Sequence, residues 1–168
     1  ERLARTRWPE DFGNEQWQYG ANTAYIRELC AYWEKQYDWR AAEREMNSFS
    51  HFRTTIDGVP IHFIHERGKG PKPFPLIITH GWPGSIYEFM EVIGPLTDPA
   101  AHGGDPADAF DVIAPSLTGY GFSGPTKECK VNIVRIAEWL TVLMTEVLGY
   151  SRYGAQGGDW GAMVTSRL

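Results

Sequence analysis

A five-residue segment near the end of the chain, Gly-Gly-Asp-Trp-Gly at 157–161, has the residue types and spacing of a catalytic turn. It lies between a predicted strand over 152–156 and a predicted helix after Gly161, and it has the form of the nucleophile elbow, G-x-S-x-G, with Asp in place of Ser. Glycines at both ends let strand and helix approach closely, so the central side chain is held above the sheet. We therefore expect Asp159 to be a nucleophile whose ionised carboxylate is favoured by the positive end of the following helix.

The identity of the central residue selects the chemistry that this turn can perform. A carboxylate is a weak nucleophile toward carbonyl groups, but it can displace a leaving group at a saturated, activated carbon. The carbon of an epoxide or of a carbon–halogen bond is of this kind. The product is an alkyl ester on Asp159, which water must then hydrolyse. The competing interpretation of the same residues is a glycine-rich turn in which Asp159 only caps a helix.

A second loop, His-Gly-Trp-Pro-Gly-Ser at 80–85, follows the apolar run 76–79 and favours the catalytic interpretation. In hydrolases with this order of elements, such a loop gives one backbone N–H of an oxyanion hole, and the residue after the nucleophile gives the other. We assign these donors to Trp82 and Trp160 and expect both residues to bind the substrate. Pro83 predicts a tight loop with a cis Trp82–Pro83 bond. The residues expected to shape the two loops without reacting are His80, Gly81, Pro83, Gly157, Gly158 and Gly161.

A third loop, 119–124, matches the glycine-rich pattern G-x-G-x-x-G. That pattern indicates a phosphate site only where it opens a helix directly after a strand. Here it follows Pro115 and contains the bulky Tyr120 and Phe122, and no other part of a dinucleotide fingerprint is present. We interpret it as a structural loop that lines the pocket.

The elements that must position these loops alternate between strand and helix signals from residue 51 onward. A hairpin is predicted over 52–65 around Asp57-Gly58, strands over 76–79, 110–114 and 152–156, and helices from 86, over 133–147 and after 161. This alternation predicts an α/β fold with a mostly parallel sheet, in which chemistry gathers at the carboxyl ends of the strands. Before it, the spacing predicts aromatic-rich helices over 22–36 and 38–46.

Together these residues resemble the epoxide hydrolases, in the branch that groups the microsomal-type enzymes with fungal and bacterial ones. The resemblance rests on the motifs at 80–85, 119–123 and 157–161, and on an amino-terminal stretch that runs from Tyr32-Trp33 through Ile56-Asp57-Gly58 to 61–65. It implies an amino-terminal segment over 1–66, which packs on the core, and the first half of an α/β-hydrolase core over 67–168.

The resemblance also implies a two-step reaction on a small-molecule epoxide without a metal or organic cofactor. Asp159 opens the epoxide, and a histidine oriented by an acidic residue activates the water that releases a diol, while two tyrosines of a helical cap bind the ring oxygen. In this fold the acid and the histidine follow the nucleophile. Only nine residues follow Asp159, and none is Asp, Glu or His. We therefore expect a partial chain that is inactive alone and that is unstable or associates through its exposed sheet, unless another chain completes it.

Composition narrows the classes of partner and compartment. The net charge is -5 with acidic and basic residues interspersed, which argues against nucleic acid as a partner. The two cysteines, Cys30 and Cys129, predict free, buried or half-buried thiols in place of a disulfide framework. His62 and His65 lie three apart in a strand and so point to opposite faces, which argues against a shared metal ion. No signal peptide or membrane-spanning run is visible, so we expect a cytoplasmic protein, with an anchor outside these residues left open.

Two other functions remain open from the sequence. A haloalkane dehalogenase uses the same attack by Asp on a different leaving group, and its elbow is the same; the loop around Trp82 and the leading segment favour the epoxide. The third hypothesis is a non-catalytic, truncated α/β-hydrolase module that serves as an interaction partner.

Overall fold

The computed structural model describes all residues from Glu1 to Leu168. The chain divides into two compact units, Glu1–Glu43 and Arg44–Leu168, which are described separately. Helix α2 (Trp39–Met46) crosses the boundary between them. None of the helices combines the length and the hydropathy that a membrane-spanning segment requires.

The first unit contains one short 3-10 helix, η1 (Leu3–Arg5), and the helix α1 (Thr23–Lys35). The Asn22 side chain caps α1 by accepting a hydrogen bond from the Tyr25 N–H, as its position before the apolar-periodic stretch predicts. The loop before α1 is organised around the buried Asn14, whose side chain accepts from the Tyr19 N–H and donates to the carbonyl of Gly20. Cys30 is half-buried, whereas Cys129 of the second unit is exposed, contrary to expectation; both are free.

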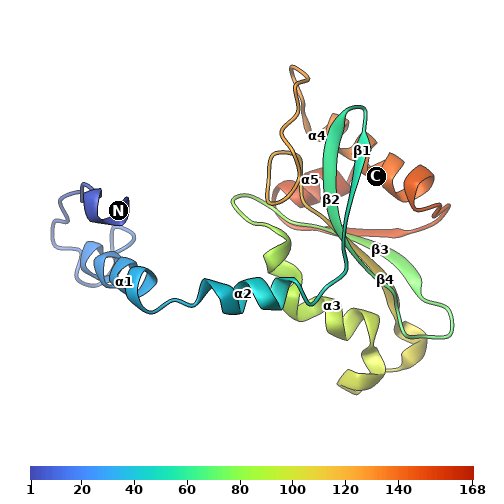
Figure 1. Cartoon of the computed structure of the whole chain (residues 1–168), viewed down its shortest axis with the longest axis horizontal. Helices are drawn as coiled ribbons and strands as arrows, with labels where there is room; N and C mark the ends of the chain where they lie inside the picture. The colour runs from blue at the N-terminus through green and yellow to red at the C-terminus, as the bar shows by residue number, and fades with distance from the viewer. The chain divides into compact units, whose positions relative to one another are not determined.

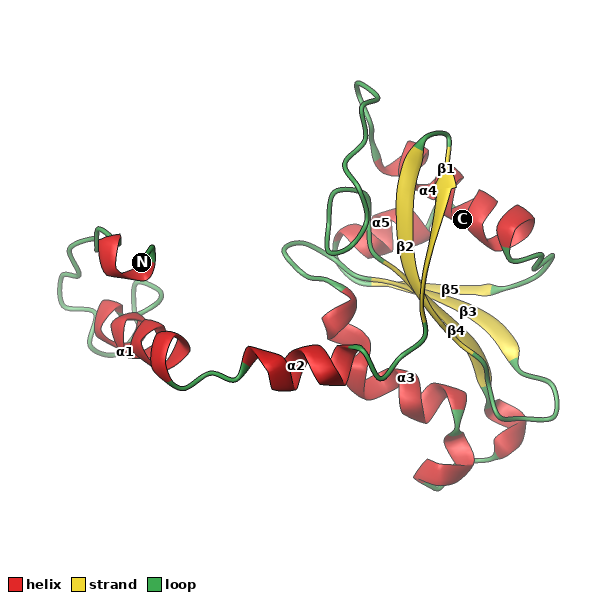
Figure 2. Cartoon of the chain, in the orientation of Figure 1, coloured by secondary structure: helices red, strands yellow, loops and turns green.

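The second unit is built on one five-stranded sheet in the order β1-β2-β4-β3-β5 (Figures 1 and 2). Its strands are β1 (His51–Ile56), β2 (Val59–Glu66), β3 (Phe74–Thr79), β4 (Phe110–Pro115) and β5 (Gly154–Gly157). The last three run parallel to one another, which confirms the predicted α/β core. The hairpin β1–β2 is an integral part of the sheet, because β2 pairs antiparallel with β4.

Helices cover both faces of this sheet. They are η2 (Ile86–Phe89), α3 (Met90–Thr97), α4 (Ile133–Val142) continued by the π-helical η5 (Leu143–Val147), and α5 (Trp160–Thr165), with the short η3 (Pro99–His102) and η4 (Pro106–Asp108) in the surface excursion. The Ser85 hydroxyl caps η2 by accepting from the Tyr87 N–H, so the element begins as a 3-10 turn and not as the predicted α-helix. The π-helical turn buries Leu143 and Met144 and leaves Val147 exposed.

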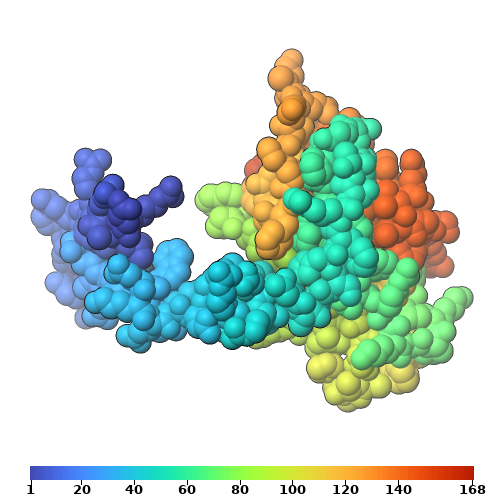
Figure 3. Space-filling view, in the orientation of Figure 1, coloured from blue at the N-terminus to red at the C-terminus, as the bar shows by residue number.

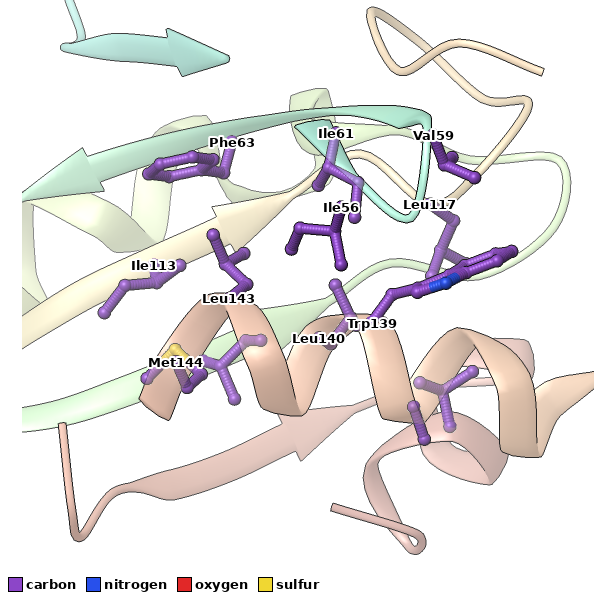
Figure 4. Packing of buried hydrophobic residues seen from close by; sticks show 13 residues of the cluster. Ile56, Val59, Ile61, Phe63, Ile113, Leu117, Trp139, Leu140, Leu143 and Met144 are labelled. Atoms are coloured by element: carbon purple, nitrogen blue, oxygen red, sulfur yellow. The ribbon is translucent and has the colours of Figure 1, made fainter. Parts of the chain in front are cut away.

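Strand alternation divides the core into two clusters on opposite faces of the sheet. In β3, Ile77 belongs to one cluster and Ile78 to the other. The first cluster includes Trp139, Leu140 and Met144 of α4 and η5, which cover this face of the sheet (Figure 4). The second cluster joins the other face of the sheet to η2 and α3. Its buried members include Ile64, Ile78, Val112 and Ala114 from the strands and Ile86, Phe89, Met90 and Ile93 from these helices. Because successive side chains of a strand point to opposite faces, each buried strand supports both layers at once.

The tip of the hairpin is fastened to α4 by a polar cluster. Asp57 and Gly58 both have positive φ, at 50° and 76°, the conformation of the tight turn that this dipeptide predicts. The Asp57 carboxylate accepts from the indole N–H of Trp139 at 3.2 Å and from Arg135 at 3.2 Å. The hairpin is therefore held at its tip as well as along its strands.

The edge of the sheet at β5 predicts how the 168-residue chain behaves in solution. Strand β5 pairs only with β3, and Ala155 and Gln156 are exposed, so one row of its backbone groups is open to another chain. We expect the chain to self-associate in sedimentation-velocity experiments. Ala155→Lys should reduce that association, because a charge on an edge strand opposes strand pairing. A wild-type chain that sediments as a monomer and unfolds in one sharp, cooperative transition would contradict this expectation.

Candidate active site

The elbow between β5 and α5 holds Asp159 in a backbone conformation that few side chains adopt. Asp159 has φ 51° and ψ -123°, and α5 begins at the next residue. A residue other than glycine in this region costs about 1–3 kcal/mol and persists only where its surroundings enforce it. Strain at this position is typical of functional sites, and here it lifts the carboxylate clear of the strand and helix that flank it.

Contacts at three glycines enforce that conformation. A Cβ on Gly161 would lie 2.1 Å from the carbonyl oxygen of Thr79, and one on Gly157 would lie 2.4 Å from the carbonyl carbon of Gly161. A Cβ on Gly81 would lie 2.6 Å from Cβ of Asp159. The end of β3, the elbow and the loop after β3 therefore meet backbone to backbone. Gly158, by contrast, has open space around its missing Cβ.

The Asp159 carboxylate lies against the two N–H groups that the sequence singles out. Its Oδ1 accepts a hydrogen bond from the Trp82 N–H at 2.8 Å. The Trp82 N–H, and after it the Trp160 N–H, lower the pKa of Asp159 below its ordinary value, since both stabilise the charged form. The Trp82–Pro83 bond is cis, as predicted, and both tryptophans are exposed.

His80 is fully buried, and both of its ring nitrogens are used inside the protein. Nε2 accepts a hydrogen bond from the Leu117 N–H at 3.0 Å, so Nδ1 carries the proton and donates it to the carbonyl oxygen of Gly81 at 3.0 Å. His80 thereby joins the loop that carries Trp82 to the loop after β4. This geometry fits a structural role and leaves no nitrogen free to act as a base.

An apolar cleft of about 400 Å³ opens beside the elbow. Its lining consists of Leu117, Tyr120, Val131, Asn132, Ile133, Ile136, Trp160, Met163 and Val164. Tyr120 comes from the 119–124 loop, as expected of a loop that lines a pocket, and its ring contacts that of His80 at 5.3 Å between centroids. The sequence reasoning missed Met163, although its spacing from Trp160 on α5 placed both on one helix face.

Two histidines of β2 lie in separate networks on opposite faces of the strand, as their spacing predicts. His62 contacts His51 and Ser116, whereas His65 contacts the Tyr150 hydroxyl at 3.1 Å. Tyr150 also donates to Asp111 at 2.9 Å, and burial followed by that hydrogen bond raises its pKa to about 12. No group of three or more His, Cys, Asp or Glu side chains is arranged to hold a metal ion.

Comparison with known proteins shows the family to which the chain belongs. Residues 1–89 match the family described as "Epoxide hydrolase N terminus", and residues 75–168 match the family described as "alpha/beta hydrolase fold". The chain belongs to the epoxide hydrolase family of the α/β hydrolases. This membership confirms the resemblance carried by the three loop motifs.

Curated relatives and solved structures agree with this membership. A putative epoxide hydrolase of Stigmatella aurantiaca (strain DW4/3-1) is 50% identical over 99% of this chain and 38% of the relative, and epoxide hydrolase 1 of Oryctolagus cuniculus is 40% identical over 100% and 38%. The juvenile hormone epoxide hydrolase of the silkworm Bombyx mori has a TM-score of 0.83 at 33% identity, over 99% of this chain and 39% of that structure. The chain thus spans about 38% of the length of these curated relatives.

A matched pair of glycine substitutions tests the steric basis of the elbow. Gly161→Ala should destabilise the fold by about 2–4 kcal/mol, because its Cβ meets the Thr79 carbonyl at 2.1 Å and neither backbone can yield. Gly158→Ala, one residue before Asp159, should change the free energy of unfolding by less than about 0.5 kcal/mol. Urea unfolding followed by tryptophan fluorescence measures both. Equal losses in the two variants would show that backbone approach does not set the geometry.

The pKa of His62 predicts a loss of stability in acid. Burial, followed by the charges of His51 and Arg53, lowers the pKa of His62 from 6.5 to about 4. Between pH 6.5 and about 4, His62 is protonated in the unfolded chain but not in the folded chain. The contribution of His62 to the free energy of unfolding is therefore complete above pH 6.5 and is lost as the pH falls toward 4. Between pH 7 and 4.5 the unfolding constant should therefore rise on the order of a hundredfold more in the wild type than in His62→Asn, as measured by urea titration. Equal rises of the unfolding constant in the wild type and in His62→Asn would contradict this prediction.

Proposed function

We propose that the chain carries the nucleophilic half of an epoxide hydrolase, an enzyme that adds water to an epoxide to give a vicinal diol. The observation that carries the proposal is the hydrogen bond from the Trp82 N–H to the Asp159 carboxylate, made in a strained elbow within a chain of this family. A helix-capping Asp would need neither the strain nor a donor from a second loop. Within α5, only the first N–H, that of Trp160, faces the Asp159 carboxylate, and the side chain makes no cap hydrogen bond, which argues against the capping interpretation.

In the first step, a carboxylate oxygen of Asp159 attacks one carbon of the epoxide ring. A carbon–oxygen bond forms to Asp159 while the ring carbon–oxygen bond breaks, and the ring oxygen keeps the electron pair and takes up a proton from water. Because Oδ1 is held by Trp82, we assign the attack to Oδ2. The lowered pKa of Asp159 keeps the carboxylate ionised and therefore ready to attack at neutral pH.

In the second step, water adds to the carbonyl carbon of the ester, and the diol leaves as the carboxylate is restored. The oxyanion of that step forms on the oxygen that stays a carbonyl, which is the Oδ1 already facing the Trp82 N–H. We assign Trp82 and Trp160 as its backbone donors, present before the charge develops. A base for the water is expected from residues that follow the nucleophile, and 160–168 contain no Asp, Glu or His.

The surroundings of Asp159 favour an apolar substrate. Trp82 and Trp160, whose N–H groups face the carboxylate, are both exposed, and the cleft that Trp160 lines is formed by apolar and aromatic side chains apart from Asn132. Proteins named juvenile hormone epoxide hydrolase, from Bombyx mori and Manduca sexta, are 39% and 36% identical to this chain. We propose a small-molecule epoxide with an apolar substituent as the substrate class. The ring contacts of Trp82 and Trp160 with it are part of the same proposal.

We further propose a reducing compartment, the cytoplasm, as the site of action. The support is the pair of unpaired thiols, Cys30 and the exposed Cys129, which persist as thiols where glutathione keeps them reduced.

Covalent labelling tests the nucleophile directly. The 168-residue chain, incubated with 1,2-epoxyhexane, should gain the mass of one epoxide per chain, and peptide mapping should place the ester on Asp159. Asp159→Asn should show no adduct, because an amide is a much poorer nucleophile. The adduct should accumulate, because release lacks a positioned base, which typically contributes about 10²–10⁴-fold.

A parallel incubation with 1-bromohexane separates the epoxide proposal from the dehalogenase alternative. Both reagents give esters on Asp159, but the bromide adds only a hexyl group, so the two products differ in mass. Faster labelling by the bromide would favour the dehalogenase. Absence of any adduct from either reagent, in a chain whose circular dichroism shows the α/β fold, would favour the non-catalytic module.

A further inference from the structure

The loop after β4, residues 116–124, is fastened along the β1–β2 hairpin by several hydrogen bonds. The Ser116 N–H donates to the His62 carbonyl at 2.9 Å, and the His62 N–H donates to the Ser123 hydroxyl at 2.9 Å. The Gly124 N–H donates to the Pro60 carbonyl at 2.9 Å. Figure 3 shows this segment, in orange, lying beside the hairpin in blue-green. The hairpin therefore holds the 116–124 loop in place at the carboxyl ends of the parallel strands.

Two histidine rings complete this attachment. His51 Nδ1 and His62 Nε2 lie 2.8 Å apart, and His62 Nδ1 lies 2.9 Å from the Ser116 hydroxyl. His51 Nε2 lies 2.8 Å from the carbonyl oxygen of Met46, which can only accept, so His51 carries its proton there. Nδ1 of neutral His51 must then accept from His62 Nε2–H, and Nδ1 of His62 must accept from the Ser116 hydroxyl. One consistent set of neutral tautomers follows.

This chain of hydrogen bonds continues to the nucleophile. Ser116 is bonded to Leu117, whose N–H donates to His80 Nε2. His80 in turn donates to the Gly81 carbonyl, and the next residue, Trp82, donates its N–H to Asp159. Ser116 and His80 are each at most 1% exposed, so water does not compete for these bonds. A shift in the position of Ser116 would therefore also shift the Trp82 N–H, which donates to the Asp159 carboxylate.

We propose that His62, oriented by His51, is a positioning residue for Asp159: through Ser116 it fixes the backbone that holds His80 and the loop of Trp82. The catalytic meaning of this role rests on the proposed function, whereas the positioning itself does not. His62 makes no contact with the reacting atoms and acts only through its neighbours.

The position of His62 depends on both imidazoles being neutral. The titratable group that faces His62 is His51, and the nearby charge is Arg53 of the same strand, whose guanidinium donates to the Phe122 carbonyl at 2.7 Å. The 116–124 loop brings no charged side chain to it, and its one titratable residue, Tyr120, faces His80. A proton added to His51 Nδ1 would oppose His62 Nε2–H across 2.8 Å, so it would reverse the direction of the hydrogen bond to Ser116.

The test follows the titration of the Asp159 carboxyl by ¹³C NMR in three variants of the 168-residue chain. His62→Leu removes the hydrogen bond to Ser116, and the Asp159 pKa should move upward toward its ordinary value as the Trp82 N–H loses its place. His62→Asn places an amide where Nδ1 was and should restore the wild-type titration. His65→Leu is the matched control, on the same strand but facing Tyr150, and should leave the titration unchanged. Labelling by 1,2-epoxyhexane should slow about tenfold in His62→Leu alone.

Ser116→Ala keeps the histidines and removes only the hydroxyl, so it tests the same link if His62→Leu fails to fold. It should move the Asp159 titration in the same direction as His62→Leu. The proposal is overturned if folded His62→Leu or Ser116→Ala titrates as the wild type does, or if His65→Leu shifts the titration equally. A wild-type chain that forms no ester would refute the proposed function, while the titration would still decide the positioning role.

Discussion

The close approach of Gly161 to the carbonyl of Thr79 is the constraint on which the site depends. It brings the first turn of α5 against the end of β3, and no side chain at position 161 is compatible with that distance. The elbow is thereby forced upward, and Asp159 takes a conformation that it would not adopt in an unconstrained turn. The same contact sets the loop after β3 beside Asp159, where Gly81 allows it to fit. The position of Asp159 is therefore a consequence of backbone packing, before any polar interaction is counted.

Polar interactions then determine the charge state of the site. The carboxylate faces backbone N–H groups of Trp82 and Trp160, and these lower its pKa without any cationic side chain. Backbone donors are fixed by the fold and need no reorganisation when charge moves from the free carboxylate to the proposed oxyanion. A cationic side chain in this place would hold the carboxylate more tightly but would compete with its attack on carbon.

The sequence predicted the three parallel strands, the hairpin, the elbow and the cis Trp82–Pro83 bond, because each has a local signature of period, turn dipeptide or glycine spacing. It did not predict that the hairpin joins the sheet through β2 and β4, since strand pairing is a long-range choice among similar apolar surfaces. The π-helical turn at 143–147 was missed for a related reason: tertiary packing of Leu143 and Met144 overrides the regular period. For His62 the sequence predicted only a side chain on the opposite face of the strand from His65, because its partners His51 and Ser116 are brought together only by the fold.

The place of the hairpin in the sheet links the amino-terminal part of the family's sequence to the proposed chemistry. The unit Arg44–Leu168 contains both the hairpin and the elbow, and the 116–124 loop is bonded to the hairpin on one side and to His80 on the other. In the proposed arrangement, two buried histidines support the same donor: His80 at the start of the loop of Trp82, and His62 on a strand that precedes the parallel core. Each of these neutral imidazoles both donates and accepts a hydrogen bond, so the donors and acceptors along the series all point in one direction. Loss of one acceptor therefore weakens the other hydrogen bonds of the series as well. The hairpin is therefore best understood as part of the support of the active site, not as a separate appendage.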